Sequence, residues 1–195
     1  MKRAILLIPL ALANLSNGPA PAPEPEPTPI VIAAEAPDTR AYDRAWSALV
    51  EKIGDELHID SPELAETVTL AVENAAVEFD LNPWLLVSLI RIESMGDPSA
   101  VSKVGALGLT QIMPVTGKEI AFDLELAEYD LFDPATNVRM GAYYLSRLLE
   151  RFEGNEREAL AAYNYGPTAV SRMLRNGEPI PKVYASKILR RLASI

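Results

Sequence analysis

The amino-acid sequence predicts a protein whose folded part is entirely α-helical. Apolar residues recur at helical spacing from about Thr39 to the C-terminus. Helix-start signals, in which a capping side chain precedes a proline, recur at Ser61-Pro62, Asn82-Pro83 and Asp133-Pro134. No segment shows the alternation typical of a half-buried strand. The 195 residues suffice for one ordinary domain and a modest extension.

The first 38 residues are predicted to lie outside this folded part. Residues 1–13, MKRAILLIPLALA, join two positive charges, a short apolar run and a small-x-small ending, which is the pattern of a secretory signal peptide. An uncleaved N-terminal anchor is the alternative, although the run is much too short to span a bilayer. Residues 14–38 contain PAPAPEPEPTP, which cannot bury apolar area, so we expect a disordered linker.

Three helices are predicted between residues 39 and 94. The first, with Trp46 on its packing face, ends near Gly54 or Leu57, and with its connection forms an accessory element over 39–61. The second extends from Pro62 to about residue 80, and the third occupies 83–94 because Gly96-Asp97-Pro98 is a helix stop.

The rest of the chain is predicted to be a loop followed by further helices. Residues 94–108 are polar and glycine-rich and predict an ordered loop, after which helix resumes over 109–113 and Pro114 begins another short helix. Residues 121–133 predict a loop with a turn of helix. The remaining helices are expected at 134–154, 156–164, 167–174 and 182–194.

Composition excludes several classes of function. There is no cysteine, so no disulfide, thiol nucleophile or thiolate metal site can form, and nothing near the single histidine, His58, supports a triad or a two-histidine zinc site. We therefore expect no metal and no cofactor, and His58 to be a surface residue. The net charge of -9 argues against nucleic acid as the main partner.

Basic residues gather near the C-terminus, despite the acidic total. Segment 171–195 has only one acidic residue, Glu178, against Arg172, Arg175, Lys182, Lys187, Arg190 and Arg191. A solvated helical face is the simpler interpretation, and a surface that helps to hold an anionic polymer is the alternative.

A glutamate ends the apolar face of the 83–94 helix. Leu86, Leu89, Ile90 and Glu93 occupy positions i, i+3, i+4 and i+7, which share one helical face. A carboxyl group at the end of such a stripe loses hydration, which raises its pKa and suits it to act as a general acid at neutral pH. The alternative is that Glu93 turns outward at a frayed helix end.

Three blocks of sequence, in order, resemble one enzyme family. IRIESMGDPSAVSKVGALGLTQIMP is similar to the signature of soluble lytic transglycosylases, and DPATNVRMGAYYLSRLLERF and ALAAYNYGPTAV resemble that family's second and third blocks. The resemblance covers about residues 62–195. It implies the lysozyme-like helical fold of goose-type lysozyme and glycoside hydrolase family 23, and a catalytic domain that cuts the glycan strands of bacterial peptidoglycan.

The resemblance also implies roles for individual residues. Glu93 matches the single catalytic acid and base of the family. Residues expected to contact the substrate or line its groove are Ser94, Ser102, Gln111, Met113, Tyr163, Asn164 and Tyr184. The Tyr163 hydroxyl is expected near the carboxyl group, where it would hold or tune it. Capping, loop or core roles are the alternatives for the two serines, Met113 and Tyr163.

One part of the sequence departs from the family pattern. The family often has an acidic residue and a threonine shortly before its C-terminal tyrosine, whereas here EPIPKVYASKIL retains Tyr184 without an acid in register. Glu178 is a displaced substitute. The departure puts in doubt the contact usually made by that acid, but not the chemistry at Glu93.

The implied reaction needs one carboxyl group. Glu93 would protonate the glycosidic oxygen between N-acetylmuramic acid and N-acetylglucosamine, then take the proton of the muramoyl 6-hydroxyl as this attacks its own anomeric carbon, giving a 1,6-anhydro end. One rival is a lysozyme-type hydrolase, with Asp97, Asp123 or Glu125 as the base that activates water. The other is a non-catalytic peptidoglycan-binding module of a secretion, conjugation or phage machine. A periplasmic or cell-envelope location is expected, with a virion as the alternative.

Overall fold

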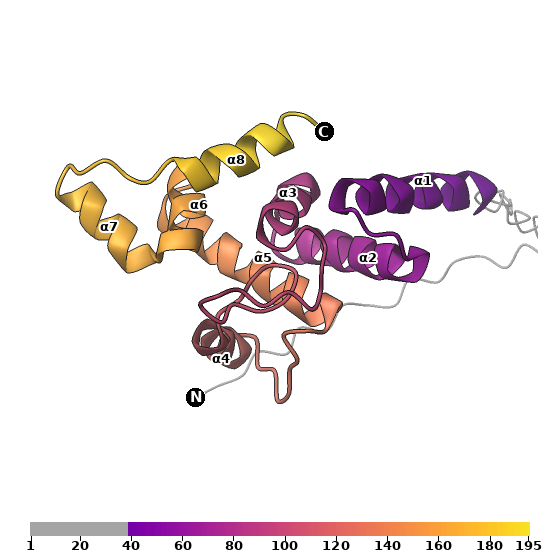
Figure 1. Ribbon diagram of the computed structural model, residues 1–195, viewed down its shortest axis with the longest axis horizontal. Coiled ribbons are helices and arrows are strands. Elements are labelled where there is room, and N and C mark those ends of the chain that lie inside the picture. Colours follow the sequence, from indigo (N-terminus) through magenta and orange to yellow (C-terminus); the bar gives the residue numbers. More distant parts are fainter. Residues whose placement is uncertain (1–38) are drawn as a thin grey trace, which may run out of the picture. The chain divides into compact units, whose positions relative to one another are not determined.

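The computed structural model describes residues 39–195, and the predicted signal peptide and linker lie outside this range. The described chain forms eight helices and no strand, which confirms the all-α prediction (Figure 1). They are α1 (Thr39–Leu57), α2 (Pro62–Glu78), α3 (Pro83–Glu93), α4 (Pro114–Asp123), α5 (Pro134–Arg151), α6 (Glu156–Tyr165), α7 (Pro167–Arg175) and α8 (Val183–Leu192). None of these described helices is long and apolar enough to cross a membrane.

Local capping explains where several helices begin. The Ser61 hydroxyl accepts a hydrogen bond from the Leu64 amide (3.2 Å), and the Asn82 side chain accepts one from the Trp84 amide (2.9 Å). Asp133 does the same for Thr136 at 2.8 Å. Each cap satisfies an N–H group that the helix cannot pair, and each is followed by proline, which needs no such partner. These three predicted starts are confirmed.

Helix α3 is the centre of the main core. All six residues from 85 to 90 are buried, including the hydroxyl-bearing Ser88. α3 packs against α1, α2 and α8, and α2 packs along α5 (Figure 1). A helix buried on most of its circumference has little freedom to shift, so its last residue, Glu93, is fixed relative to several other helices.

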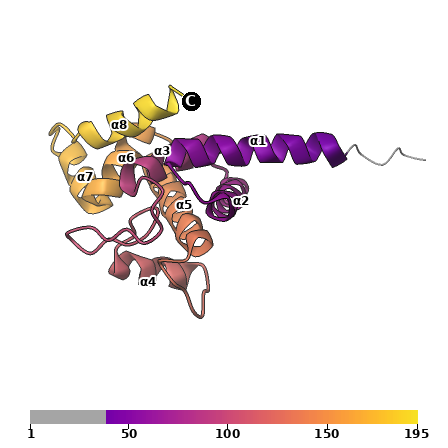
Figure 2. The same cartoon turned by 45° about the vertical axis from the view of Figure 1, so that its right-hand side comes forward.

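Helix α1 packs on the surface formed by α2 and α3 (Figure 2). Its Ile53 and Leu57 are fully buried in the main core. Two charged residues of α1 also face the fold: Lys52 lies 4.5 Å from the centre of the Trp84 ring, and Glu56 pairs with Arg191 of α8. α1 is therefore integrated into the folded unit by both apolar and charged contacts.

The prediction of a helix over 109–113 is wrong. Residues 101–112 instead form a compact loop with two antiparallel bridges, between Val101 and Leu107 and between Leu107 and Ile112. Gln111 has φ of 54°, in the left-handed region, which ends any right-handed helix there.

Asn137 of α5 holds this loop from within the protein. Its side-chain oxygen accepts hydrogen bonds from the Thr110 amide (2.8 Å) and hydroxyl (2.7 Å). Its amide group donates to the carbonyl oxygens of Leu107 (3.0 Å) and Leu131 (2.7 Å). The buried asparagine thus replaces backbone partners that a helix would have supplied, and the loop is fixed without regular structure.

Two glycines allow the loop to approach α5 this closely. A Cβ atom on Gly141 would lie 2.4 Å from the Thr110 hydroxyl oxygen, and one on Gly108 would lie 2.3 Å from the Asn137 amide nitrogen. Gly108 also has φ of 74°, which glycine adopts without strain. Both positions need glycine for steric reasons.

Candidate active site

Glu93 is the last residue of α3, at the end of the apolar face that the spacing predicted. Leu86, Leu89 and Ile90 are all fully buried on that face. Glu93 itself is half-buried and does not turn outward into solvent. Its carboxyl group therefore lies at the boundary between the core and the surface.

The Tyr184 hydroxyl of α8 donates a hydrogen bond to the Glu93 carboxyl oxygen Oε1. Burial raises the pKa of the Glu93 carboxyl above its ordinary value of 4.5, and the hydrogen bond from Tyr184 lowers it by less. A carboxyl group in this position keeps its proton to a higher pH than an exposed glutamate does, while its orientation is fixed by the tyrosine. These are the properties required of a general acid.

Tyr163 of α6 lies near the carboxyl but does not hold it. Its hydroxyl donates to the carbonyl oxygen of Thr110 at 3.0 Å, so the tyrosine bonded to Glu93 is Tyr184 and not Tyr163. Burial, and then the negative charge of Glu93, raise the pKa of Tyr163 well above its ordinary value of 10.0. Tyr163 is therefore a neutral group whose pKa is affected by the charge on Glu93. Its hydrogen bond to Thr110 fixes it to the loop that Asn137 holds.

A cleft of about 260 Å³ collects four of the predicted residues from separate parts of the chain. Gln111 and Met113 come from the loop and the start of α4, while Tyr163 and Asn164 come from the end of α6. The cleft is further lined by Tyr144 of α5, whose ring lies 5.2 Å from that of Tyr163. Glu93 does not line this cleft. Its negative charge nevertheless raises the pKa of Tyr163, which does line the cleft.

The side-chain amide of Gln111 is used within the loop. It donates to the carbonyl oxygens of Gly108 (2.9 Å) and Ala100 (3.2 Å). Gln111 therefore stabilises the wall of the cleft in addition to lining it.

Ser94 and Ser102 make local hydrogen bonds. The Ser94 hydroxyl donates to the Ile90 carbonyl (3.3 Å) and accepts from the Gly96 amide (3.2 Å) at the end of α3. The Ser102 hydroxyl accepts from the Ala106 amide at 2.9 Å. These contacts match the capping and loop roles that the sequence left open for the two serines. Neither serine lines the cleft.

The acidic residues considered as a second catalytic carboxylate either accept hydrogen bonds from neighbouring side chains or backbone, or are exposed. The Asp97 carboxylate accepts hydrogen bonds from Ser99, Asp123 accepts one from the Tyr143 hydroxyl at 3.0 Å, and Glu125 is exposed. Burial raises the pKa of Glu93, and the hydrogen bond from Tyr184 lowers it by less. Glu178, considered as a displaced substitute for the family's acid, is exposed and accepts a hydrogen bond from Asn176 at 2.9 Å.

The described range, 39–195, contains no group of three or more histidine, aspartate or glutamate side chains that could hold a metal ion. His58 is exposed, as the sequence predicted, and its ring nitrogen Nε2 lies 3.0 Å from an Arg91 nitrogen.

Sequence reasoning missed Asn137 and the Thr110 carbonyl that it positions. Asn137 is fully buried in α5, beside Val138 and one turn before Met140 and Gly141. An asparagine between residues of a buried helical face was the available signal, because a buried amide needs several hydrogen-bond partners.

Comparison with known proteins supports the family suggested by the three sequence blocks. The family model for the transglycosylase SLT domain matches residues 71–180. The chain belongs to the transglycosylase SLT domain family.

Similar proteins include two named transglycosylases. The chain is 31% identical over 118 residues to the transglycosylase of Enterobacteria phage PRD1, covering 60% of this chain and 40% of that protein. It is 36% identical over 101 residues to the soluble lytic murein transglycosylase of Salmonella typhimurium, covering 50% of this chain and 16% of that protein. The chain thus spans less than half the length of each of these two relatives.

The fold also matches a solved structure from this family. The lytic transglycosylase Slt of Pseudomonas aeruginosa, solved as an inactive glutamate-to-glutamine mutant, superposes with a TM-score of 0.58 at 26% identity. The match covers 79% of this chain and 28% of that one. It confirms the fold of lytic transglycosylases that the sequence blocks predicted.

The buried carboxyl group predicts a pH-dependent stability difference between wild type and Glu93→Gln. Because burial raises the pKa of Glu93 above 4.5, the folded state favours the protonated form. The wild type has the full contribution of this group below about pH 4.5, and loses it as the pH rises through the raised pKa. The glutamine variant does not titrate, so its unfolding free energy relative to wild type should increase as the pH rises from about 4.5 to about 7.

Urea unfolding at a series of pH values measures this difference. Glu128→Gln, at an exposed position outside the site, is the matched control. A Glu93→Gln difference that stays constant or decreases with rising pH would contradict the burial of the carboxyl group.

Proposed function

We propose that this protein is a peptidoglycan lytic transglycosylase and that Glu93 is its catalytic acid and base. The proposal rests on the half-buried Glu93 carboxyl group, whose pKa is raised, which accepts a hydrogen bond from Tyr184, and whose charge affects Tyr163 in the cleft. Membership of the SLT domain family, and relatives named as transglycosylases and lytic murein transglycosylases, support the same assignment.

In the proposed reaction Glu93 donates its proton to the glycosidic oxygen between N-acetylmuramic acid and N-acetylglucosamine. The bond from this oxygen to the anomeric carbon breaks, and the N-acetylglucosamine 4-hydroxyl leaves. The Glu93 carboxylate then takes the proton of the muramoyl 6-hydroxyl, whose oxygen bonds to the same anomeric carbon. No water is consumed, and Glu93 ends the cycle protonated, as it began.

One carboxyl group suffices because the nucleophile belongs to the substrate. The muramoyl 6-hydroxyl attacks within its own sugar, so proximity supplies much of what a positioned water and a second carboxylate supply in a hydrolase. The substrate's N-acetyl group stabilises the positive charge that develops at the anomeric carbon.

Burial suits Glu93 to both of its roles. A raised pKa keeps the acid protonated to a higher pH than in an exposed glutamate, and also makes the carboxylate a stronger base once the proton has left. Tyr184 keeps the carboxyl group in one orientation between the two steps. Tyr163, Gln111, Met113 and Asn164 are proposed to contact the sugars along the cleft.

Mass spectrometry of peptidoglycan digested with the purified protein tests the proposal. We expect muropeptides with 1,6-anhydro ends, released by wild type and reduced by about a hundredfold to ten-thousandfold with Glu93→Gln, the range for loss of a general acid. Asp97→Asn, Asp123→Asn and Glu125→Gln serve as matched controls and should retain activity. Products with reducing ends would show hydrolysis, and loss of activity in one of these controls would identify a second catalytic carboxylate.

We further propose that the protein is exported to the cell envelope, since its polymeric substrate lies there. The signal-like sequence of residues 1–13 supports export, and residues 14–38 would then link the signal to the catalytic domain. Fractionation of cells producing the full chain, followed by N-terminal sequencing, tests this. Protein retained in the cytoplasm with an intact N-terminus would contradict it.

A further inference from the structure

A second groove lies between α1, the connection that follows it, and the first turns of α2. It encloses about 400 Å³ and is lined by residues from 46 to 66, all of which precede the part of the chain matched by the family model. No residue of the cleft at Gln111 and Tyr163 lines it. The groove is therefore separate from the proposed catalytic site.

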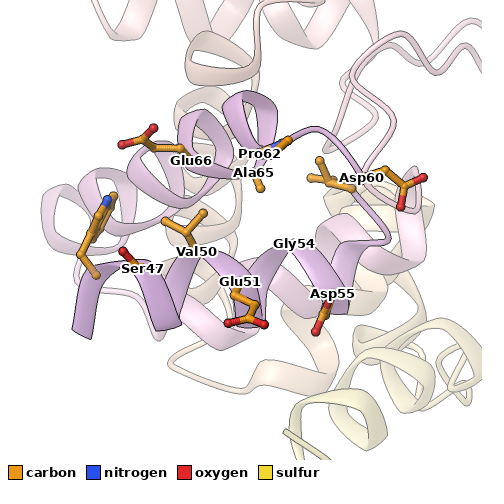
Figure 3. Close-up of a pocket in the computed structure, with 11 residues that line it drawn as sticks. Ser47, Val50, Glu51, Gly54, Asp55, Asp60, Pro62, Ala65 and Glu66 are labelled. Carbon is orange, nitrogen blue, oxygen red and sulfur yellow. The ribbon is translucent and has the colours of Figure 1, made fainter. Parts of the chain in front are cut away.

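The inside of this groove is apolar. Gly54 lets the two helices approach closely, since a Cβ atom there would lie 3.2 Å from that of Ala65. Figure 3 shows Val50 and Ala65 in the space between the helices. Half-buried Trp46 and Ile59 complete the apolar lining. A concave apolar surface of this size accommodates one or two large side chains of a partner.

The edge of the groove is acidic. Glu51, Asp55, Asp60 and Glu66 are among its lining residues and have exposed side chains, and no basic residue lines it. None of these four carboxylates forms an ion pair with any residue between 39 and 195. Lys52 of α1 faces Trp84 and the C-terminal carbonyl instead. The groove thus combines an apolar interior with a negatively charged edge.

We propose that this groove binds a segment of a partner protein in which a large apolar side chain is flanked by lysine or arginine residues. The apolar side chain would occupy the space beside Val50 and Trp46, and the basic side chains would contact the carboxylates at the edge. Such a pairing of charges favours fast association and rejects acidic partners. The protein's own residues 14–38 carry acidic residues and no lysine or arginine, so charge excludes them as the occupant.

Binding at this groove would leave the catalytic cleft open. The lining residues belong to α1, α2 and their connection, whereas the cleft is formed by residues 111–116, α5 and the end of α6. The partner would therefore determine where the enzyme is held without blocking its access to glycan. The proposal does not depend on the catalytic assignment.

Fluorescence anisotropy with the full chain and a labelled KKLFLKK peptide tests the proposal. We expect saturable binding that weakens as salt rises from about 50 to about 300 mM, because screening acts on the charged edge. The peptides EELFLEE and KKSGSKK, which lack one of the two required features, should bind at least about tenfold more weakly.

The variant Glu51→Lys/Asp55→Lys should also weaken binding of KKLFLKK by at least about tenfold. Glu128→Lys/Glu153→Lys makes the same change of net charge at exposed positions outside the groove and should bind like wild type. Both variants should keep the circular dichroism spectrum and unfolding midpoint of wild type, which shows that they are folded whether or not the protein cleaves glycan.

Three results would overturn the proposal. The first is no saturable binding of KKLFLKK to wild type, and the second is equal loss of binding in both charge-reversal variants. The third is self-association of wild type in sedimentation experiments that Glu51→Lys/Asp55→Lys abolishes, because the occupant would then be the basic C-terminal segment of a second copy.

Discussion

The half-burial of the Glu93 carboxyl group against the Tyr184 hydroxyl is the interaction on which the proposed chemistry depends. It joins the end of α3 to α8 through two residues that lie 91 positions apart in sequence. The cost of removing a carboxylate from water raises the pKa of Glu93, and the hydrogen bond from Tyr184 fixes the orientation of the carboxyl group. α3 can hold such a group because its preceding residues are anchored in the core.

The second requirement is a rigid wall for the cleft that Gln111 and Tyr163 line. The loop at 101–112 has little regular structure, so its rigidity comes from Asn137, whose four hydrogen bonds reach Thr110, Leu107 and Leu131. Thr110 in turn accepts the Tyr163 hydroxyl. The buried side-chain amide of Asn137 therefore connects α5, the loop and α6 through hydrogen bonds. A substitution at Asn137 would change the shape of the cleft, although Asn137 does not line it.

The sequence was sufficient where local chemistry decides the structure. Capping residues before prolines and apolar spacing predicted most helices, and the apolar stripe below Glu93 predicted the partial burial of its carboxyl group. The helix prediction from the sequence failed at 109–113, because the Thr110 amide donates its hydrogen bond to Asn137, which lies 27 residues away. The sequence also selected Tyr163 to hold the carboxyl, because only the folded arrangement brings Tyr184 to Glu93. The groove between α1 and α2 has no motif at all, since it arises from the packing of two helices.

A carbon-13 NMR titration of the Glu93 side-chain carboxyl in the wild type, assigned by comparison with Glu93→Gln, tests the role of burial most directly. Burial predicts a single transition with a pKa above 4.5, and this pKa should rise further in Tyr184→Phe because the hydrogen bond from Tyr184 lowers it. A pKa at or below 4.5 would contradict the role of burial. A titration in two coupled steps would reveal a second carboxylate and favour a hydrolase.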